Sequence, residues 1–190
     1  MLLKKGGSVK NFEPKSIVFA EGTECIYYHQ LVSGRVAWEN SNDEGKEFIQ
    51  KIIEPGECFG ELPLFDDGLY AADAITIEPS EVARLPKSTF LQILRENPDI
   101  HFEFSRVLAQ RLRFDFRLLK SFAFETPEER IRTLLNYLKN QQRNNSPMQV
   151  MLTRQQIANM TGLRVETVIR SIIALGKKGE LNINQGKVYI

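Results

Sequence analysis

Two arginines and a glutamate near the C-terminus have the chemistry and the spacing to recognise nucleic-acid bases. Arg164, Glu166 and Arg170 are expected to point outward from one short helix. An arginine can donate two hydrogen bonds to O6 and N7 of guanine, and a glutamate can accept one from the amino group of cytosine. These residue types in this order predict recognition of base edges in the major groove of DNA.

The residues around these side chains predict a helix-turn-helix. Thr153 is a favourable N-cap for a first helix, with Gln156 in the capping-box position. Three further residues follow the spacing of the motif: Ala158 where the helices approach, Gly162 at the turn and Val168 facing the first helix. Ile172 and Ile173 are expected to face inward with Val168. Such spacing also occurs by chance in other helical pairs. The helix-turn-helix is predicted because the spacing agrees with the N-cap of the first helix and with the charged residues expected to point outward from the second.

A hairpin after Gly179 is predicted to form the wing of this domain. Residues 181–183 and 187–190 are joined by the turn Asn184-Gln185-Gly186. Lys187 lies at the tip, where its ammonium group can contact a phosphate. The alternative is a C-terminal domain that contacts protein, but such a surface would favour exposed apolar residues over the charged ones named above.

The charge of the chain is uneven. The net charge is only +1, but residues 1–124 hold 15 basic and 19 acidic residues, whereas residues 125–190 hold 10 basic and 5 acidic ones. The positive excess in the last third suits a polyanionic partner for that part alone. A solvated basic surface explains the excess equally well, so charge supports the DNA-binding interpretation without deciding it.

The elements in front of this region are of the β type. Between Lys15 and about Leu85, short apolar runs alternate with turns, and Gly22, Gly34, Gly45 and Gly56 recur at intervals of 12, 11 and 11 residues. This interval predicts an antiparallel barrel or sandwich, which we assign to residues 1–96. The expected strands are residues 17–19, 26–28, 35–38, 48–53, 74–77 and 81–85, with a hairpin loop at 42–45 and a tight turn at 54–57.

A long helix is expected over residues 97–124. A short helix capped by Ser88 precedes it, and Asn97-Pro98-Asp99 suits a helix start. Its apolar stripe is wider than one face, which favours packing against a second copy, with packing inside one chain as the alternative. The residues expected along the dimer helix are Phe104, Val107, Leu108, Arg111, Leu112, Asp115, Leu118, Leu119 and Phe122.

A second domain is predicted over residues 125–190. Thr126 is a good N-cap, Pro127 fits the first helical turn and Glu129 completes a capping box. This helix is expected to reach about Gln142. A polar loop at residues 143–147 and a strand at residues 149–152 then lead into the helix-turn-helix.

Signatures of catalysis and metal binding are missing from the sequence. It contains no Gly-x-Ser-x-Gly, His-Glu-x-x-His or P-loop, so no enzyme is expected. Cys25 and Cys58 lack zinc-ligand spacing, and ordinary reduced thiols are favoured over redox sensing. His29 and His101 are isolated, so neither haem nor a metal ion is predicted. No apolar run reaches the about 20 residues of a membrane span, and the protein is expected in the cytoplasm.

The chain resembles the CRP/FNR family of bacterial transcription regulators over nearly all of its length. The matching blocks are Gly34-Arg-Val36, Gly45-Lys-Glu47, Pro55-Gly-Glu-Cys-Phe-Gly-Glu-Leu62, Asn97-Pro-Asp-Ile100, Leu152-Thr-Arg-Gln155 and Val165-Glu-Thr-Val-Ile-Arg170. The resemblance implies an α+β fold: an N-terminal double-stranded β-roll of the cyclic-nucleotide-binding type, a long dimerisation helix and a C-terminal winged helix-turn-helix. It also implies a homodimer on a two-fold symmetric site in double-stranded DNA, with RNA polymerase as a further partner.

Within this resemblance, Glu166 and Arg170 match the base-reading positions. Val165 stands where the cyclic-AMP-responsive branch has an arginine, and so resembles the FNR branch. That implies a TTGA-like half-site, in which an apolar side chain contacts a thymine methyl group. Ile169 departs from the serine common in that branch, which leaves the outer bases open. The other implied DNA contacts are Thr153, Arg154, Gln155, Arg164, Thr167 and Lys187.

The sensor pocket implied by the resemblance departs from the family pattern. Nucleotide-binding members supply an arginine and a small hydroxylated residue where this chain has Leu69-Tyr-Ala-Ala-Asp73. No Lys or Arg occurs between Lys51 and Arg84, so a buried phosphate would lack a cation. Cyclic AMP is therefore disfavoured against an unknown small-molecule effector or none. The residues of this degenerate pocket are Phe59, Gly60, Glu61, Leu62, Ala71 and Ala72. No cofactor is expected, and the cysteine cluster that holds iron–sulfur in FNR itself is absent.

Overall fold

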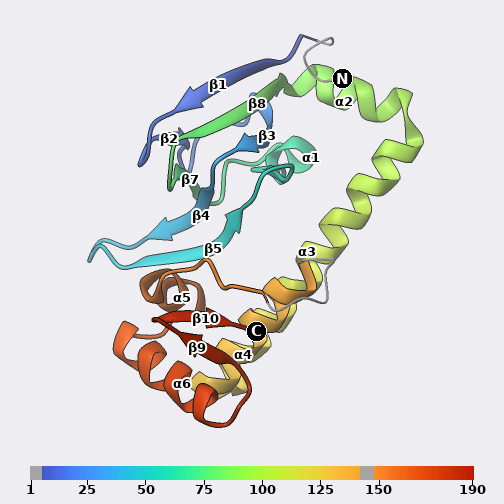
Figure 1. Ribbon diagram of the computed structural model, residues 1–190. Coiled ribbons are helices and arrows are strands. Elements are labelled where there is room, and N and C mark those ends of the chain that lie inside the picture. Colours follow the sequence, from blue (N-terminus) through green and yellow to red (C-terminus); the bar gives the residue numbers. More distant parts are fainter. Residues whose placement is uncertain (1–5, 142–147) are drawn as a thin grey trace. The chain divides into compact units, whose positions relative to one another are not determined.

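The computed structural model describes residues 6–141 and 148–190 (Figure 1). Two compact units follow one another along the chain, one up to Phe104 and one from Ser105 on. Helix α3 (Pro98–Phe124) contributes its first turns to the first unit and the remainder to the second. The predicted α+β class is confirmed, since the first unit is built mainly from strands and the second mainly from helices.

Two four-stranded antiparallel sheets form the first unit. The first sheet contains, in spatial order, β1 (Ser8–Phe12), β8 (Ser80–Pro86), β3 (Tyr27–Ser33) and β6 (Cys58–Phe59). The second contains β2 (Ile17–Phe19), β7 (Asp73–Thr76), β4 (Val36–Ser41) and β5 (Glu47–Ile53). Because most neighbours within a sheet are distant in sequence, the chain crosses repeatedly between the sheets, as expected of the predicted β-roll.

Two predicted turns are confirmed in this unit. The Gly45 N–H donates to Asn42 O at 2.9 Å between β4 and β5, and Gly45 has a φ of +74°. The Glu57 N–H donates to Glu54 O at 3.1 Å, and Gly56 has a φ of +92°. Glycine adopts such positive φ values without the strain that a side chain would add, which is why its regular spacing marked these turns.

Aromatic side chains fill the space between the two sheets. Phe19 of β2 stacks on Tyr70 with ring centroids 3.7 Å apart. Its ring centroid is 5.3 Å from that of His29 on β3 and 5.8 Å from that of Phe59 on β6. All four side chains are buried. The core of the first unit also contains both cysteines, which are buried thiols.

Helices close one side of this core. The short helix α1 (Pro63–Asp66) follows β6, and α2 (Lys87–Glu96) follows β8. Phe90 of α2 stacks on Tyr28 at 4.3 Å between ring centroids and meets Phe104 of α3 at 5.4 Å. The start of α3 is therefore packed on the first unit through aromatic contacts.

The structure differs from the sequence-based elements in several places. β1 is absent from the prediction, because four of its five residues are exposed and show no apolar alternation. Ile26 lies outside β3 and is exposed. Helix α2 begins directly after Pro86 without a side-chain cap, so Ser88 lies within its first turn and is not its N-cap.

After α3, the second unit continues with the predicted capping box. The Thr126 N–H donates to Glu129 Oε2 at 2.8 Å, and the Glu129 N–H donates to the Thr126 hydroxyl at 3.4 Å. These bonds satisfy the first turn of α4 (Pro127–Gln141), which packs on α5 (Arg154–Thr161) and α6 (Val165–Lys177). The predicted polar loop at residues 143–147 lies outside the described residues.

A small sheet completes this unit. β9 (Asn182–Asn184) and β10 (Lys187–Tyr189) form the predicted hairpin. The strand predicted at residues 149–152 is reduced to a short pairing with β10, in which the Val150 N–H donates to Val188 O at 2.8 Å and Gln149 lies opposite Tyr189.

Candidate functional site

The predicted helix-turn-helix is formed by α5 and α6. The Thr153 hydroxyl accepts from the Gln156 N–H at 3.1 Å, and the Gln156 side chain accepts from the Thr153 N–H at 2.9 Å. Gly162 ends α5 in the left-handed conformation, with a φ of +65°, and its N–H donates to Ala158 O. Helix α6 begins three residues later. The capping box, the turn glycine and the helix order are therefore as predicted.

The predicted base-reading side chains lie on the exposed side of α6. Glu166 and Arg170 are about one helical turn apart, and both are exposed. Arg164, which precedes the helix, is exposed as well. Arg170 Nη2 lies 3.4 Å from the hydroxyl of Thr167. The N-terminal half of α6 thus presents acceptor and donor groups of the kind that recognise base edges.

One side chain of α6 that was expected to face inward points outward. Ile173 is 47% exposed, whereas Ser171 is buried. At about 100° per residue, Ile173 lies roughly 140° around the helix from the buried Val168, so the two cannot share a face. Ile169, one turn earlier, is 42% exposed. Together the two isoleucines place an apolar strip beside Arg170.

The predicted phosphate contacts fall at the starts of the two helices and on the wing. Thr153 and Gln155 are exposed at the start of α5, and the Gln155 side chain donates to Asn159 Oδ1 at 2.8 Å. Thr167 lies half-buried in the first turn of α6. Backbone N–H groups at the start of a helix can bind phosphate. Thr153 and Gln155 at the start of α5 and Thr167 on α6 therefore lie where a phosphate would be stabilised.

The wing turn is joined to α5 by a side chain. Gln185 and Gly186 both have positive φ, +48° and +77°, as in a two-residue hairpin turn. Arg154 of α5 donates from Nη2 to Gly186 O at 3.0 Å. Lys187, the next residue, is exposed. Arg154 is therefore directed at the wing, while Lys187 faces solvent.

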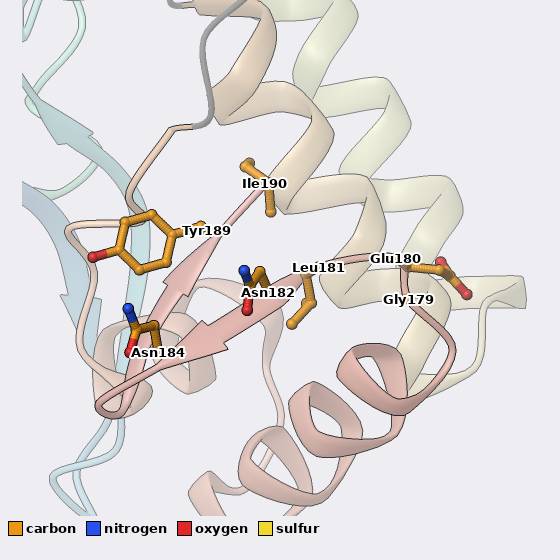
Figure 2. Close-up of a pocket in the computed structure, with 7 residues that line it drawn as sticks. All are labelled: Gly179, Glu180, Leu181, Asn182, Asn184, Tyr189 and Ile190. Atoms are coloured by element: carbon orange, nitrogen blue, oxygen red, sulfur yellow. The ribbon is translucent and has the colours of Figure 1, made fainter.

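A surface hollow of about 720 Å³ adjoins the wing (Figure 2). Its lining residues are Gly179, Glu180, Leu181, Asn182, Asn184, Tyr189 and Ile190. The predicted DNA contacts are not among them. Glu180 is paired with Arg132, from Oε2 to Nε at 2.6 Å. The hollow therefore lies outside the predicted nucleic-acid interface.

Arg130 is a structural residue of this site that sequence reasoning missed. Its guanidinium donates to the carbonyls of Phe122 and Glu125, each at 3.4 Å, and of Thr161 at 3.2 Å. It also lies 5.3 Å from the Phe122 ring centroid, and a Cβ on Gly162 would lie 3.9 Å from that ring. Arg130 therefore ties the end of α3 to the end of α5. Its position in the first turn of α4 gave no sign of this, because the side chain leaves its own helix.

The predicted effector pocket is closely packed. Gly60 has a φ of +66°, and a Cβ on it would lie 2.5 Å from Phe19 Cζ and 2.9 Å from Tyr70 Cε1. Glu61 is 1% exposed, and Phe59 and Ala72 are fully buried. Leu62 and Ala71 are instead exposed. The predicted pocket residues are thus divided between a filled core and the surface.

His29 and Arg84 lie against this core. They face each other across β3 and β8, and His29 also lies opposite Phe59 on β6. Burial, with a smaller contribution from the positive charge of Arg84, lowers the pKa of His29 to about 3. Among the described residues, His29 Nδ1 has no hydrogen-bond partner. The imidazole is therefore neutral at physiological pH.

The predicted dimer residues of α3 differ in exposure. Val107, Leu112 and Leu119 are 37%, 56% and 61% exposed. Leu118 is buried within the second unit, and Phe104 packs on the first. The remaining positions Leu108, Arg111 and Phe122 are half-buried, and Asp115 is exposed.

A seam of regular spacing runs along this helix. Leu108, Leu112, Asp115, Leu119 and Phe122 are separated by 4, 3, 4 and 3 residues. Alternation of four and three is the spacing by which one helix packs along another in a coiled coil.

Comparisons with known proteins agree with this architecture. Residues 9–97 match the family model of the cyclic nucleotide-binding domain, and residues 129–190 match that of the Crp-like helix-turn-helix domain. The cAMP-activated global transcriptional regulator CRP of Pasteurella multocida is 38% identical over 154 residues, which cover 79% of this chain and 73% of the relative.

Two solved structures share the fold. FixK2 of Bradyrhizobium japonicum superposes with a TM-score of 0.82 at 20% identity, covering 97% of this chain and 92% of the other. The c-di-GMP responsive regulator CLP of Xanthomonas campestris gives a TM-score of 0.76 at 20% identity, covering 100% and 97%.

None of the described helices combines the length and the hydropathy needed to cross a lipid bilayer. The two matching domain models, the relative from P. multocida and the shared fold together identify a DNA-binding transcription regulator rather than an enzyme. The chain belongs to the CRP/FNR family.

Proposed function

We propose that this regulator acts as a homodimer that reads an inverted DNA repeat with TTGA-like arms through Glu166 and Arg170. The observation that carries this proposal is that both side chains are exposed on α6. This helix follows α5, which begins with a capping box and ends at a glycine, as in a helix-turn-helix. Arg170 offers two donors to guanine, and Glu166 offers an acceptor to cytosine. Val165, half-buried at the start of α6, offers methyl groups to thymine.

The seam of α3 supports dimerisation. Leu112 and Leu119 are more than half exposed, although both are large apolar side chains. Burying such side chains against a second copy would remove them from water, at about 25 cal/mol per Å² of apolar surface. A two-fold dimer would also present two copies of α6 to two DNA half-sites, which accounts for an inverted repeat.

The functional divisions that we propose are a β-roll sensor (residues 1–96), a dimerisation helix (97–124) and a winged helix-turn-helix (125–190). RNA polymerase is the proposed protein partner, because the family acts on transcription. The cytoplasm is the proposed location, since that is where bacterial DNA is found.

DNA binding in this proposal does not require cyclic AMP. Gly60 lies against the Phe19–Tyr70 stack, and the segment from residue 52 to residue 83 supplies no cation for a phosphate. A buried phosphate without a cation carries a large desolvation cost. An unknown small-molecule effector, or none, is therefore favoured.

A cyclic nucleotide is the second candidate effector, and two observations favour it. The relative from P. multocida is named as cAMP-activated. Arg84 also faces the core side of β8 beside His29, so one cation lies near the packed cluster. Calorimetric titration of the purified protein with cyclic AMP tests this second candidate: saturable binding would show that the protein takes up the nucleotide, and absence of binding would exclude cyclic AMP as its effector.

The experiment that tests the main proposal is selection of bound sequences from a random DNA pool. The purified protein is used with and without cyclic AMP at a stated salt concentration, since phosphate contacts make affinity salt-dependent. We expect an inverted repeat with TTGA-like arms under both conditions. Recovery only with cyclic AMP would overturn the effector proposal, and recovery of sequences without two-fold symmetry would overturn the dimer.

Two variants separate base reading from phosphate binding on the selected DNA. Arg170→Ala should weaken binding by about 1–3 kcal/mol and relax the preference for one base pair. Lys187→Ala should weaken binding to all sequences alike, because phosphates carry no sequence information. Equal losses on selected and random DNA for Arg170→Ala would contradict its assigned role.

A further inference from the structure

Arg154 faces the wing although it lies among the predicted DNA contacts. It is the first residue of α5, and its Nη2 donates to Gly186 O at 3.0 Å. The side chain is half-buried, and burial lowers its pKa. Its neighbours Thr153 and Gln155 are exposed. The guanidinium group of Arg154 is therefore engaged with the backbone of its own domain, whereas its neighbours point to solvent.

The accepting carbonyl belongs to the turn that carries Lys187. Leu181 and Val188, at the base of the hairpin, are buried, while all of residues 182–187 are exposed. The base of the wing is thus anchored in the core, and its tip projects from it beside α5 (Figure 1). The bond from Arg154 gives this tip a second point of attachment.

We propose that Arg154 is a positioning residue, which holds the tip of the wing so that Lys187 reaches a DNA phosphate, and that Arg154 is not itself a phosphate ligand. This inference rests on the proposed function, because it describes how the same DNA interface is built. One donor of the Arg154 guanidinium is bonded to the Gly186 carbonyl and the side chain is half-buried, whereas the ammonium of Lys187 is exposed. Removing either Arg154 or Lys187 would then abolish the same interaction with a phosphate.

The first test needs no DNA. Amide hydrogen exchange is followed by mass spectrometry in the full chain, for peptides that cover residues 181–190. Arg154→Ala should speed exchange in this segment several-fold, whereas Lys187→Ala should leave it unchanged. Lys139→Ala is the matched control, because it removes one exposed positive charge from α4 of the same unit. Unchanged exchange in Arg154→Ala would overturn the proposal. Arg154→Gln replaces it if the alanine variant does not fold.

The second test measures how many DNA phosphates each variant neutralises on the selected DNA. The slope of log affinity against log salt becomes shallower by about 0.9 for each phosphate that the protein no longer neutralises. Arg154→Ala and Lys187→Ala should each lower the slope by about 0.9, and the double variant should lower it by the same amount. Its affinity should lie within about twofold of the weaker single variant, as expected when two changes remove one interaction. A slope lowered by about 1.8 in the double variant would make Arg154 an independent phosphate ligand and overturn the proposal.

The two tests separate this inference from the proposed function. If the wild-type protein selects no DNA, with or without cyclic AMP, the proposed function fails and the role of Lys187 fails with it. The exchange measurement still decides whether Arg154 anchors the wing. If the protein selects DNA and the exchange is unchanged, only the inference about Arg154 fails.

Discussion

Replacing Gly60 with alanine should destabilise the first unit more than replacing Gly45 does. Both glycines have positive φ, +66° and +74°, which costs an alanine roughly 1–2 kcal/mol at either position. A Cβ on Gly45 meets nothing within 4 Å, whereas one on Gly60 lies 2.5 Å from Phe19 and 2.9 Å from Tyr70. Carbon atoms prefer separations of about 3.5–4.0 Å, so a ring must move by about 1 Å. Overpacking of this kind adds about 1–3 kcal/mol.

We therefore expect a loss of about 1–2 kcal/mol for Gly45→Ala and about 2–5 kcal/mol for Gly60→Ala. The chain has one tryptophan, Trp38, which is 9% exposed in β4 of the same unit. Its fluorescence during urea unfolding reports on this unit. With a slope of about 1–3 kcal/mol per M, a difference of about 2 kcal/mol separates the two midpoints by roughly 1 M. Phe19→Leu in the Gly60→Ala background should recover part of the loss.

Equal midpoints for the two alanine variants would refute this reasoning. They would mean that the space beside Gly60 is open and that the Phe19–Tyr70 stack does not fill it. Only the missing cation would then disfavour a cyclic nucleotide in this core.

Two further variants test other interactions. His29 has a pKa of about 3 when folded, below the about 6.5 of an unfolded histidine, so its contribution to stability is complete above about pH 6.5 and is lost as the pH falls toward 3. The free energy of unfolding of the first unit, followed by Trp38 fluorescence, should therefore depend less on pH in His29→Leu, by about 1.4 kcal/mol per pH unit between about pH 6 and 4. His101→Gln, which replaces an exposed histidine, should leave the pH dependence unchanged. An unchanged slope in His29→Leu would contradict the lowered pKa of His29. Arg130→Met should destabilise the second unit by about 2–3 kcal/mol, because three carbonyls lose a charged donor. Hydrogen exchange in α4 measures this loss. Arg132→Met is the control: it breaks an exposed ion pair with Glu180 and should cost less than about 1 kcal/mol. Equal effects of the two arginine variants would show that Arg130 does not join the helix ends.

Features decided by local chemistry could be predicted from the sequence. The capping boxes at Thr126 and Thr153 depend on residues three positions apart, and both form as expected. The turn at Gly162 needs a positive φ, which glycine supplies most readily. These signals lie within a few residues of the structure they determine, so no tertiary information was required.

Features decided by distant packing could not be predicted in the same way. The inward assignment of Ile173 is a different kind of error: Ile172 lies about 40° around α6 from Val168 and is buried with it, whereas Ile173 is exposed. A stricter use of the 3.6-residue period would have excluded Ile173, since it does not share a face with Val168. The carbonyl partners of Arg130 and Arg154 lie 5 to 32 residues away, and no periodic pattern in the sequence indicates where such long side chains point.

The two buried cysteines provide the protein with its own chemical probes. Cys25 precedes β3 and Cys58 begins β6, and each is less than a tenth exposed. A thiol reacts only when a reagent reaches it, so neither should be modified at an appreciable rate until the surrounding core opens. The rate at which a colourless disulfide reagent labels each sulfur therefore measures how often that part of the β-roll opens. If an effector occupies this core, it should slow the labelling of both thiols without touching either one.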